Sequence, residues 1–146
     1  MRVRELLHPV LKVAGDVSVK EVAQLMDLHN VGSVLVETKG KEVGIVTERD
    51  ILRKIVAKHQ DPVVVKVSSI MTKELYTIDH EVDVLEASRM MDEKKIRRLL
   101  VTEYGKIIGK ITANAISRNM RFLLAQRLAY TSTLESFHPE YTFYQH

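Results

Sequence analysis

Several residue types that often reveal a function are absent from this chain of 146 residues. There is no cysteine, which excludes a disulfide framework and thiolate chemistry and is compatible with a reducing cytoplasm. No apolar run approaches the roughly 18 residues that a membrane-spanning helix needs, and the first residues do not follow the pattern of a signal peptide. We therefore expect a cytoplasmic protein that is not embedded in a membrane.

Metal-binding and catalytic patterns are missing as well. The six histidines show no HxxxH or HExxH spacing, so we predict no metal site. No serine or threonine belongs to a recognisable catalytic group, and we expect no enzyme activity. The net charge of +3 is too small to indicate nucleic-acid binding by itself. Aromatic residues are scarce except near the end of the chain, at Phe137, Tyr141, Phe143 and Tyr144.

The stretch at residues 44–50 (GIVTERD) carries the most specific chemical signal. Thr47 ends an apolar strand, and apolar residues at helical spacing follow Asp50, so a strand meets a helix here. One interpretation is a capping box, in which Thr47 caps the helix and Asp50 reaches back to the Thr47 N–H. The other is a ligand site, because helix N-terminal N–H groups attract anions and a carboxylate can bind the hydroxyls of a ribose. The stretch alone favours the capping box.

An internal repeat with an offset of 65 residues organises the chain. Met26 matches Met91, Gly44 matches Gly109 and Thr47 matches Thr112, and we predict that no gap is needed from Val3–Ser68 to Arg53–Arg118. The pattern of each copy predicts strand, helix, strand, strand and helix; in the first copy these lie at 10–13, 19–30, 33–37, 42–46 and 48–59. Apolar residues make up 45% of the chain, enough for a compact core.

We therefore predict an α+β fold of two pseudo-symmetric half-domains, because neither half alone could bury both faces of its small sheet. Repeat one is placed at residues 1–60, a linker at 61–67, repeat two at 68–118, and a helical extension and tail at 119–146. The aromatic residues of the tail are expected to form an arm that packs on a partner subunit, although a frayed tail is the alternative.

The tandem pattern resembles a pair of CBS domains, also called a Bateman module, of the stand-alone type found in prokaryotes. The resemblance rests on residues 70–72 (IMT), 96–101 (IRRLLV) and 44–52 (GIVTERDIL), and it covers roughly residues 3 to 118. It implies a regulatory sensor that binds an adenine nucleotide, AMP, ADP or ATP, in clefts between the repeats and acts on a partner protein. No resident cofactor is expected.

The resemblance also implies which residues bind the nucleotide. Asp50 would hold the ribose hydroxyls, apolar side chains and backbone groups would contact the base, and the basic residues would bind phosphate. The residues implied are Ile45, Thr47 and Asp50 from repeat one, and Met71, Thr72, Leu75, Tyr76, Ile96, Arg97 and Arg98 from repeat two.

Less specific interpretations also fit these residues. The arginine pair could be an ordinary solvated charge pair at a helix C-terminus, and Tyr76 could serve packing only. The whole chain could be a ligand-free structural or protein-interaction module. A third alternative is nucleic-acid binding through the basic residues Arg49, Arg53, Lys54 and Lys58.

The second copy departs from the pattern. Ala115 stands where the first copy has Asp50, and Gly32 and Ser33 stand where the second has Arg97 and Arg98. The twin cleft, which keeps Thr112, is therefore expected to lack both the ribose acid and the phosphate cations, leaving one nucleotide per chain. We also expect a homodimer, because apolar helix faces need a cover. The face proposed for that contact contains Ile51, Ile55, Ile116 and Met120.

Overall fold

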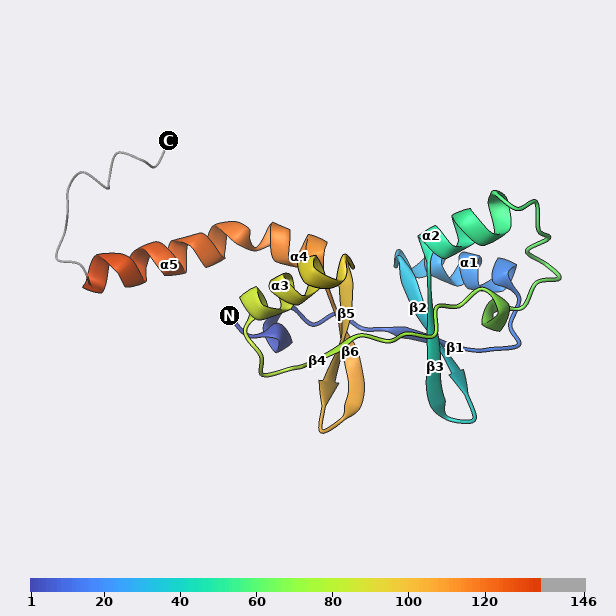
Figure 1. The fold of residues 1–146 in the computed structure, drawn as a ribbon, viewed down its shortest axis with the longest axis horizontal. Helices are drawn as coiled ribbons and strands as arrows, with labels where there is room; N and C mark the ends of the chain where they lie inside the picture. The colour runs from blue at the N-terminus through green and yellow to red at the C-terminus, as the bar shows by residue number, and fades with distance from the viewer. Residues whose placement is uncertain (135–146) are drawn as a thin grey trace.

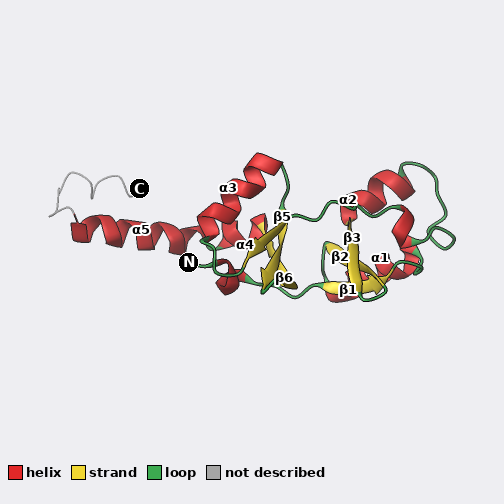
Figure 2. Ribbon diagram, turned by 60° about the horizontal axis from the view of Figure 1, so that its bottom comes forward, coloured by secondary structure: helices red, strands yellow, loops and turns green. Residues whose placement is uncertain are grey.

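The structure is a computed structural model, and it describes residues 1–134, with side chains up to residue 129. Two half-domains lie side by side, and a long helix, α5 (Met120–Leu134), extends away from the second (Figures 1 and 2). Each half-domain has a three-stranded sheet with helices packed against it. The predicted α+β class and the two pseudo-symmetric repeats are confirmed.

The two halves share one topology. In the first, β1 (Leu11–Ala14) pairs parallel with β2 (Ser33–Thr38), which pairs antiparallel with β3 (Lys41–Thr47). In the second, β4 (Thr77–Asp79), β5 (Arg98–Glu103) and β6 (Lys106–Thr112) repeat this order. A tight turn with positive φ at Gly40 or Gly105 joins each antiparallel pair, as expected for these hairpins.

The crossover helices follow the predicted bounds closely. Helix α1 (Val19–His29) begins at the N-cap Ser18, whose side chain accepts a hydrogen bond from the Glu21 N–H at 3.2 Å. Helix α3 (Val84–Lys94) begins at the N-cap Asp83. Both helices end on a residue in the left-handed conformation, Asn30 or Lys95. Each helix buries one apolar stripe against its own sheet.

The helices that follow the outer strands are less regular than predicted. Helix α2 (Glu48–Ile51) passes directly into the π-helical segment η2 (Leu52–Val56), where the Ala57 N–H donates to the Leu52 carbonyl at 2.9 Å. The regular helix therefore ends before the predicted residue 59. Its counterpart is α4 (Ala113–Arg118).

The N-terminal segment crosses to the other half-domain. Val3, in the short helix η1 (Val3–Leu6), is fully buried in the second core, and Figure 1 shows the N-terminus beside that half. Val67, in η3 (Val67–Ser69), is equally buried in the first core, although it follows the first repeat in sequence. Each half-domain is therefore completed by a segment that precedes the other repeat, which ties the two halves together.

This exchange corrects the predicted register of the repeat. Val3 corresponds to Val67 rather than to Ser68, because both are buried and both open a short helix. His8 forms a bridge with Lys110 as Thr72 does with Ile45, again an offset of 64. The offset of 65 applies from the first strands onward, so the prediction of an ungapped repeat from Val3 is wrong. One extra residue lies between Thr72 and β4, in a loop that borders the cleft described below.

Two glycines allow these exchanged segments to approach the sheets. A Cβ at Gly44 would lie 2.5 Å from the Met71 Sδ, and a Cβ at Gly109 would lie 2.6 Å from the Leu7 Cδ1. At Gly109 a Cβ would also lie 2.6 Å from the His8 carbonyl oxygen, a backbone atom that cannot turn aside, so this position requires glycine, whereas a side chain at Gly44 would force the Met71 side chain to shift. The matching glycines of the repeat therefore mark the places where the crossing segments pack.

The apolar helix face proposed for dimer contact needs correction. Ile55 and Ile116 are buried in their own half-domains, because the helices turn these side chains toward the sheets. The exposed apolar side chains nearby are Leu52 and Val56, which are 60% and 62% exposed, and Met120.

The aromatic residues Phe137, Tyr141, Phe143 and Tyr144, predicted to form an arm, lie outside the described residues. Within residues 1–134, no helix combines the length and hydrophobicity that a membrane span requires.

Candidate functional site

Two clefts of similar size lie between the half-domains, related by the pseudo-two-fold symmetry of the repeat. The first, called here the Asp50 cleft, has a volume of about 560 Å³. It is bordered by the junction of β3 and α2, by the loop before β4 and by the turn between α3 and β5. The predicted residues that line it are Ile45, Thr47, Asp50, Thr72, Leu75, Tyr76, Ile96, Arg97 and Arg98.

Met71 is the predicted site residue that the structure places elsewhere. Its side chain lies against Gly44 and packs on the first core, and it does not line the cleft. The neighbouring Thr72 forms two backbone hydrogen bonds with Ile45, of 2.9 and 2.8 Å. The Met71 side chain thus fixes this segment to the first core, while Thr72 and the loop after it border the cleft.

The Asp50 carboxylate has a different set of partners on each oxygen. Its Oδ2 accepts hydrogen bonds from the Thr47 N–H at 3.0 Å and from the Thr47 hydroxyl at 3.1 Å, and the Asp50 N–H donates to the Thr47 Oγ1. The capping-box interpretation is therefore confirmed. The Asp50 Oδ1 contacts the Lys54 Nζ at 3.2 Å and the Thr72 hydroxyl at 3.5 Å. Both of these partners are exposed side chains that can be displaced, so the cap leaves one carboxylate oxygen able to bind a ligand hydroxyl.

Apolar side chains from both halves form a slot beside Asp50. Ile45 contributes from β3, and Leu75, Tyr76 and Ile96 contribute from the second half-domain. Among the described residues, no backbone hydrogen bond uses the N–H or C=O groups of Glu74 and Leu75. Free backbone groups beside apolar walls can read the edge of a purine while its faces remain in contact with carbon.

Tyr76 has both packing and polar contacts. Its ring packs against the second core, and the Lys94 ammonium lies 5.6 Å from the ring centre. A hydrogen bond with Glu74 raises the pKa of the Tyr76 hydroxyl. The Tyr76 ring therefore has the packing role that the alternative predicted, and the residue also borders the cleft.

The cleft contains more cations than the sequence analysis assigned to it. Arg49, Arg53, Lys54 and Lys95 line it together with the predicted arginine pair. Arg49, Arg53 and Lys54 also belong to the nucleic-acid alternative; they are exposed side chains at the cleft between the half-domains. Arg98 is partly buried, and its Nη1 donates to the Gly32 carbonyl at 3.0 Å. Arg97 donates to the Asn114 side chain at 3.3 Å. Burial lowers the pKa of Arg98, an effect that the nearby Glu48 carboxylate partly offsets.

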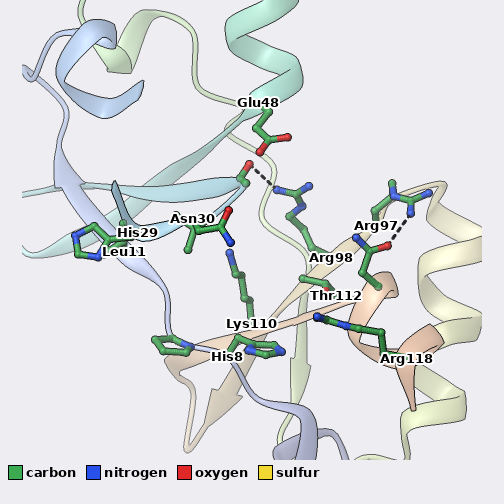
Figure 3. Close-up of a pocket in the computed structure, with 14 residues that line it drawn as sticks. His8, Leu11, His29, Asn30, Glu48, Arg97, Arg98, Lys110, Thr112 and Arg118 are labelled. Atoms are coloured by element: carbon green, nitrogen blue, oxygen red, sulfur yellow. Dashed lines mark hydrogen bonds between the residues drawn. The ribbon is translucent and has the colours of Figure 1, made fainter. Parts of the chain in front are cut away.

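The twin cleft also has a volume of about 560 Å³, but its lining differs (Figure 3). Of the predicted second-site residues, Gly32 and Thr112 line it, whereas Ser33 and Ala115 are buried beneath its surface. Ala115 leaves no acid at the position equivalent to Asp50, but a different carboxylate, that of Glu48, lines this cleft. The prediction that it lacks cations is wrong. The cationic side chains that line it are Arg97, Arg98, Lys110 and Arg118.

Lys110 is the least expected of these cations. It occupies β6, is only 6% exposed, and its Nζ donates to the Ser33 hydroxyl at 3.2 Å. Burial lowers the pKa of Lys110, and the neighbouring Arg98 lowers it further, while Glu48 opposes both effects. The offset of the repeat aligns Lys110 with Ile45, so an apolar wall position in one cleft is a cation in the other. That comparison of aligned positions could have identified Lys110 from the sequence.

The described residues offer no metal centre. No three His, Cys, Asp or Glu side chains within them form a group that could hold a metal ion. The arrangement instead suits an organic anion, with apolar walls, one carboxylate and several guanidinium and ammonium groups between two half-domains.

Comparison with known families agrees with this geometry. The pattern of the CBS domain matches residues 3–57 and 67–121, which together make up most of the chain. The chain belongs to the CBS-domain family. A CBS-domain-containing protein from Agrobacterium tumefaciens, ATU1752, superposes with a TM-score of 0.76 at 27% identity, covering 82% of this chain and 99% of that one. The shared fold therefore accounts for nearly all of that solved chain.

Sequence relatives are of several kinds. The uncharacterised protein MK0525 of Methanopyrus kandleri is 37% identical over 107 residues, which make up 72% of this chain and 55% of that protein. The inosine-5'-monophosphate dehydrogenase of Korarchaeum cryptofilum is 34% identical over 112 residues, or 76% of this chain, but the match covers 22% of that enzyme. The chain spans just over half the length of the first curated relatives that it matches, from 52% to 59%.

Proposed function

We propose that this CBS pair is a regulatory module that binds an adenine nucleotide, AMP, ADP or ATP, in the Asp50 cleft and signals occupancy to a partner protein. The observation that carries the proposal is a capping-box carboxylate that keeps one oxygen outside the cap, beside an apolar slot. The Asp50 Oδ2 is engaged by Thr47, whereas its Oδ1 contacts only the displaceable groups of Lys54 and Thr72. Asp50 is 13% exposed, so its carboxylate is held firmly yet borders the cleft.

Each part of a nucleotide has a matching group in this cleft. The base fits between Ile45 and the loop before β4, where the backbone groups of Glu74 and Leu75 are free to pair with its edge. The ribose hydroxyls would donate to Asp50. The phosphates would bind the guanidinium groups of Arg97 and Arg98, which offer planar pairs of donors.

Regulation follows from the position of the cleft. The ligand would contact both half-domains at once, so its binding favours the arrangement in which they are correctly spaced. Nothing in this cleft requires bond-breaking chemistry, and we propose that the module is not itself an enzyme. A regulated protein would detect the change in spacing or rigidity.

We also propose that the module is a homodimer. Leu52 and Val56 form an exposed apolar pair on the π-helical segment, and Met120 and Phe122 are exposed near the start of α5. A second copy related by a two-fold axis is the commonest cover for such faces.

Isothermal titration calorimetry with AMP and adenosine tests the nucleotide proposal, using the wild type and Asp50→Asn. Binding of both ligands to the wild type, with a common loss in Asp50→Asn, is expected. A chain that binds neither ligand at millimolar concentration would instead support the alternative of a structural or interaction module with empty clefts.

A further inference from the structure

The twin cleft has the same volume as the Asp50 cleft, but side chains of different chemistry line it. At the positions equivalent to Ile45 and Asp50 it has Lys110 and Ala115. It therefore lacks the counterpart of the Asp50 carboxylate and has a cation in place of one apolar wall residue, although Pro9, Leu11 and Val31 still line it. Its charged side chains are mostly cations: Arg97, Arg98, Lys110 and Arg118 line it, and Glu48 is the carboxylate among its described lining residues.

Lys110 is the decisive residue of this cleft. Its side chain is more than nine-tenths buried, and among the described residues its ammonium group donates a hydrogen bond to the uncharged hydroxyl of Ser33. Within the described residues neither Lys110 nor Arg98 forms an ion pair with a carboxylate. Glu48 is the nearby carboxylate, so one negative charge faces several cations in this cleft. Buried cations in excess of their counter-charge are costly to the fold, and an anion from solution would offset that cost.

The other cations approach the same space from separate elements. Figure 3 shows Arg98 from β5, Lys110 from β6 and Arg118 from α4 extending into the cleft, with His8 and His29 at its border. Because the cations are spread over the cleft rather than focused on one point, a ligand with several charged oxygens matches them better than a single carboxylate does.

We propose that the twin cleft binds a small polyanion of the phosphate class, such as a diphosphate or a longer oligophosphate, and does not require a nucleoside. The proposal stands apart from nucleotide binding in the Asp50 cleft, because it uses Lys110 and Arg118, which do not line that cleft. Arg97 and Arg98 line both clefts, so a polyanion in one competes for the guanidinium groups that would bind phosphate in the other. The two sites are therefore coupled, and a polyanion weakens binding of a nucleotide but not of a nucleoside.

The test is a calorimetric titration of the full chain with inorganic pyrophosphate, without magnesium and at fixed low salt. We expect wild type to bind, and Lys110→Met and Arg118→Met each to weaken binding about tenfold or more. Lys106→Met is the matched control, since Lys106 is an exposed lysine of the same strand that does not line the cleft. Asp50→Asn should bind pyrophosphate as wild type does.

Three results would overturn the proposal. One is the absence of pyrophosphate binding by wild type at millimolar concentration. Another is an equal loss of pyrophosphate affinity in Lys106→Met and Lys110→Met, which would show that net charge alone attracts the anion. The third is weaker pyrophosphate binding in Arg53→Met with no change in Lys110→Met, which would place the anion in the Asp50 cleft, because Arg53 lines that cleft and not the twin cleft. Failure of the nucleotide proposal looks different, because AMP and adenosine would then fail to bind while pyrophosphate still depended on Lys110. Because Arg118 is exposed, Arg118→Met tests the same cleft without changing a buried side chain.

Discussion

The carboxylate of Asp50 accepts two hydrogen bonds from Thr47 on one oxygen, at 3.0 and 3.1 Å, and contacts Lys54 with the other at 3.2 Å. Capping and ligand binding are therefore compatible in this residue, because they use different oxygens. The cap fixes the carboxylate at the start of α2 and directs its remaining oxygen to the cleft. Removal of the whole side chain should affect stability and affinity together, so the two effects need different substitutions.

The first prediction concerns the cap. Asp50→Ala removes the reciprocal half of the capping box and should lower the free energy of unfolding by about 1 kcal/mol. Asp50→Asn should cost less, because the amide oxygen can still accept the hydrogen bond from the Thr47 N–H. Urea denaturation of the ligand-free protein measures both. Equal stability of wild type and Asp50→Ala would show that the box contributes nothing to folding.

The second prediction concerns the phosphate contacts. Arg97→Met should weaken AMP binding about tenfold and change adenosine binding little, because adenosine has no phosphate. The affinity for AMP should also become less sensitive to salt. Arg89→Met is the control, since Arg89 is an exposed arginine that pairs with Glu86 on α3 and lines neither cleft. If Arg97→Met reduced adenosine and AMP binding equally, Arg97 would not be a phosphate ligand.

The third prediction concerns pH and Lys110. Burial lowers the pKa of Lys110 from its ordinary value of 10.5, so between the two pKa values the unfolded chain binds more protons than the folded chain. The destabilisation by this buried cation is complete below the folded pKa and disappears as the pH rises toward 10.5. Lys110→Met should thus be at least as stable as wild type at pH 7, with an advantage that shrinks at alkaline pH.

Thermal unfolding of wild type and Lys110→Met from pH 7 to pH 10 measures this difference. The loss of the hydrogen bond to Ser33 opposes the gain, so the pH trend is more informative than the difference at any one pH. An advantage that grew with pH would have the wrong sign and would contradict the assignment of a lowered pKa.

The fourth prediction concerns assembly. Light scattering at micromolar concentration should give the mass of a dimer, and Leu52→Lys combined with Val56→Lys should give a monomer, because charges replace an exposed apolar pair. Leu85→Lys is a control at an exposed leucine of α3. A monomeric wild type would contradict the homodimer, and dissociation by Leu85→Lys alone would move the interface to α3.

Much of the fold could be predicted because local patterns and the repeat agree with each other. Ser18 and Asn30 marked the two ends of α1, and Gly40 and Gly105 marked the hairpins, since each position has a local conformational requirement. The match of residues 44–52 to the family pattern predicts a cleft at Asp50, and the structure has one there.

The rest depends on contacts between distant segments, which no local pattern contains. Val3 and Val67 are apolar residues in short segments, and nothing in their neighbours indicates that they exchange between half-domains. The resemblance predicts Met71 in the cleft, but Gly44 provides a space that the Met71 side chain fills. Lys110 was overlooked because a lysine within an apolar strand is ordinarily expected to face solvent, and here it faces the other half-domain.

The central claim is that the Asp50 cleft holds one adenine nucleotide per chain. Calorimetric titration with AMP tests it most directly, on wild type, Asp50→Asn and, as the control in the other cleft, Lys110→Met. We predict one tight site per chain in wild type and in Lys110→Met, and about a hundredfold weaker binding of both AMP and adenosine in Asp50→Asn, because a carboxylate that binds two ribose hydroxyls contributes roughly 3 kcal/mol. Two tight sites per chain, or unchanged affinity in Asp50→Asn, would contradict the account.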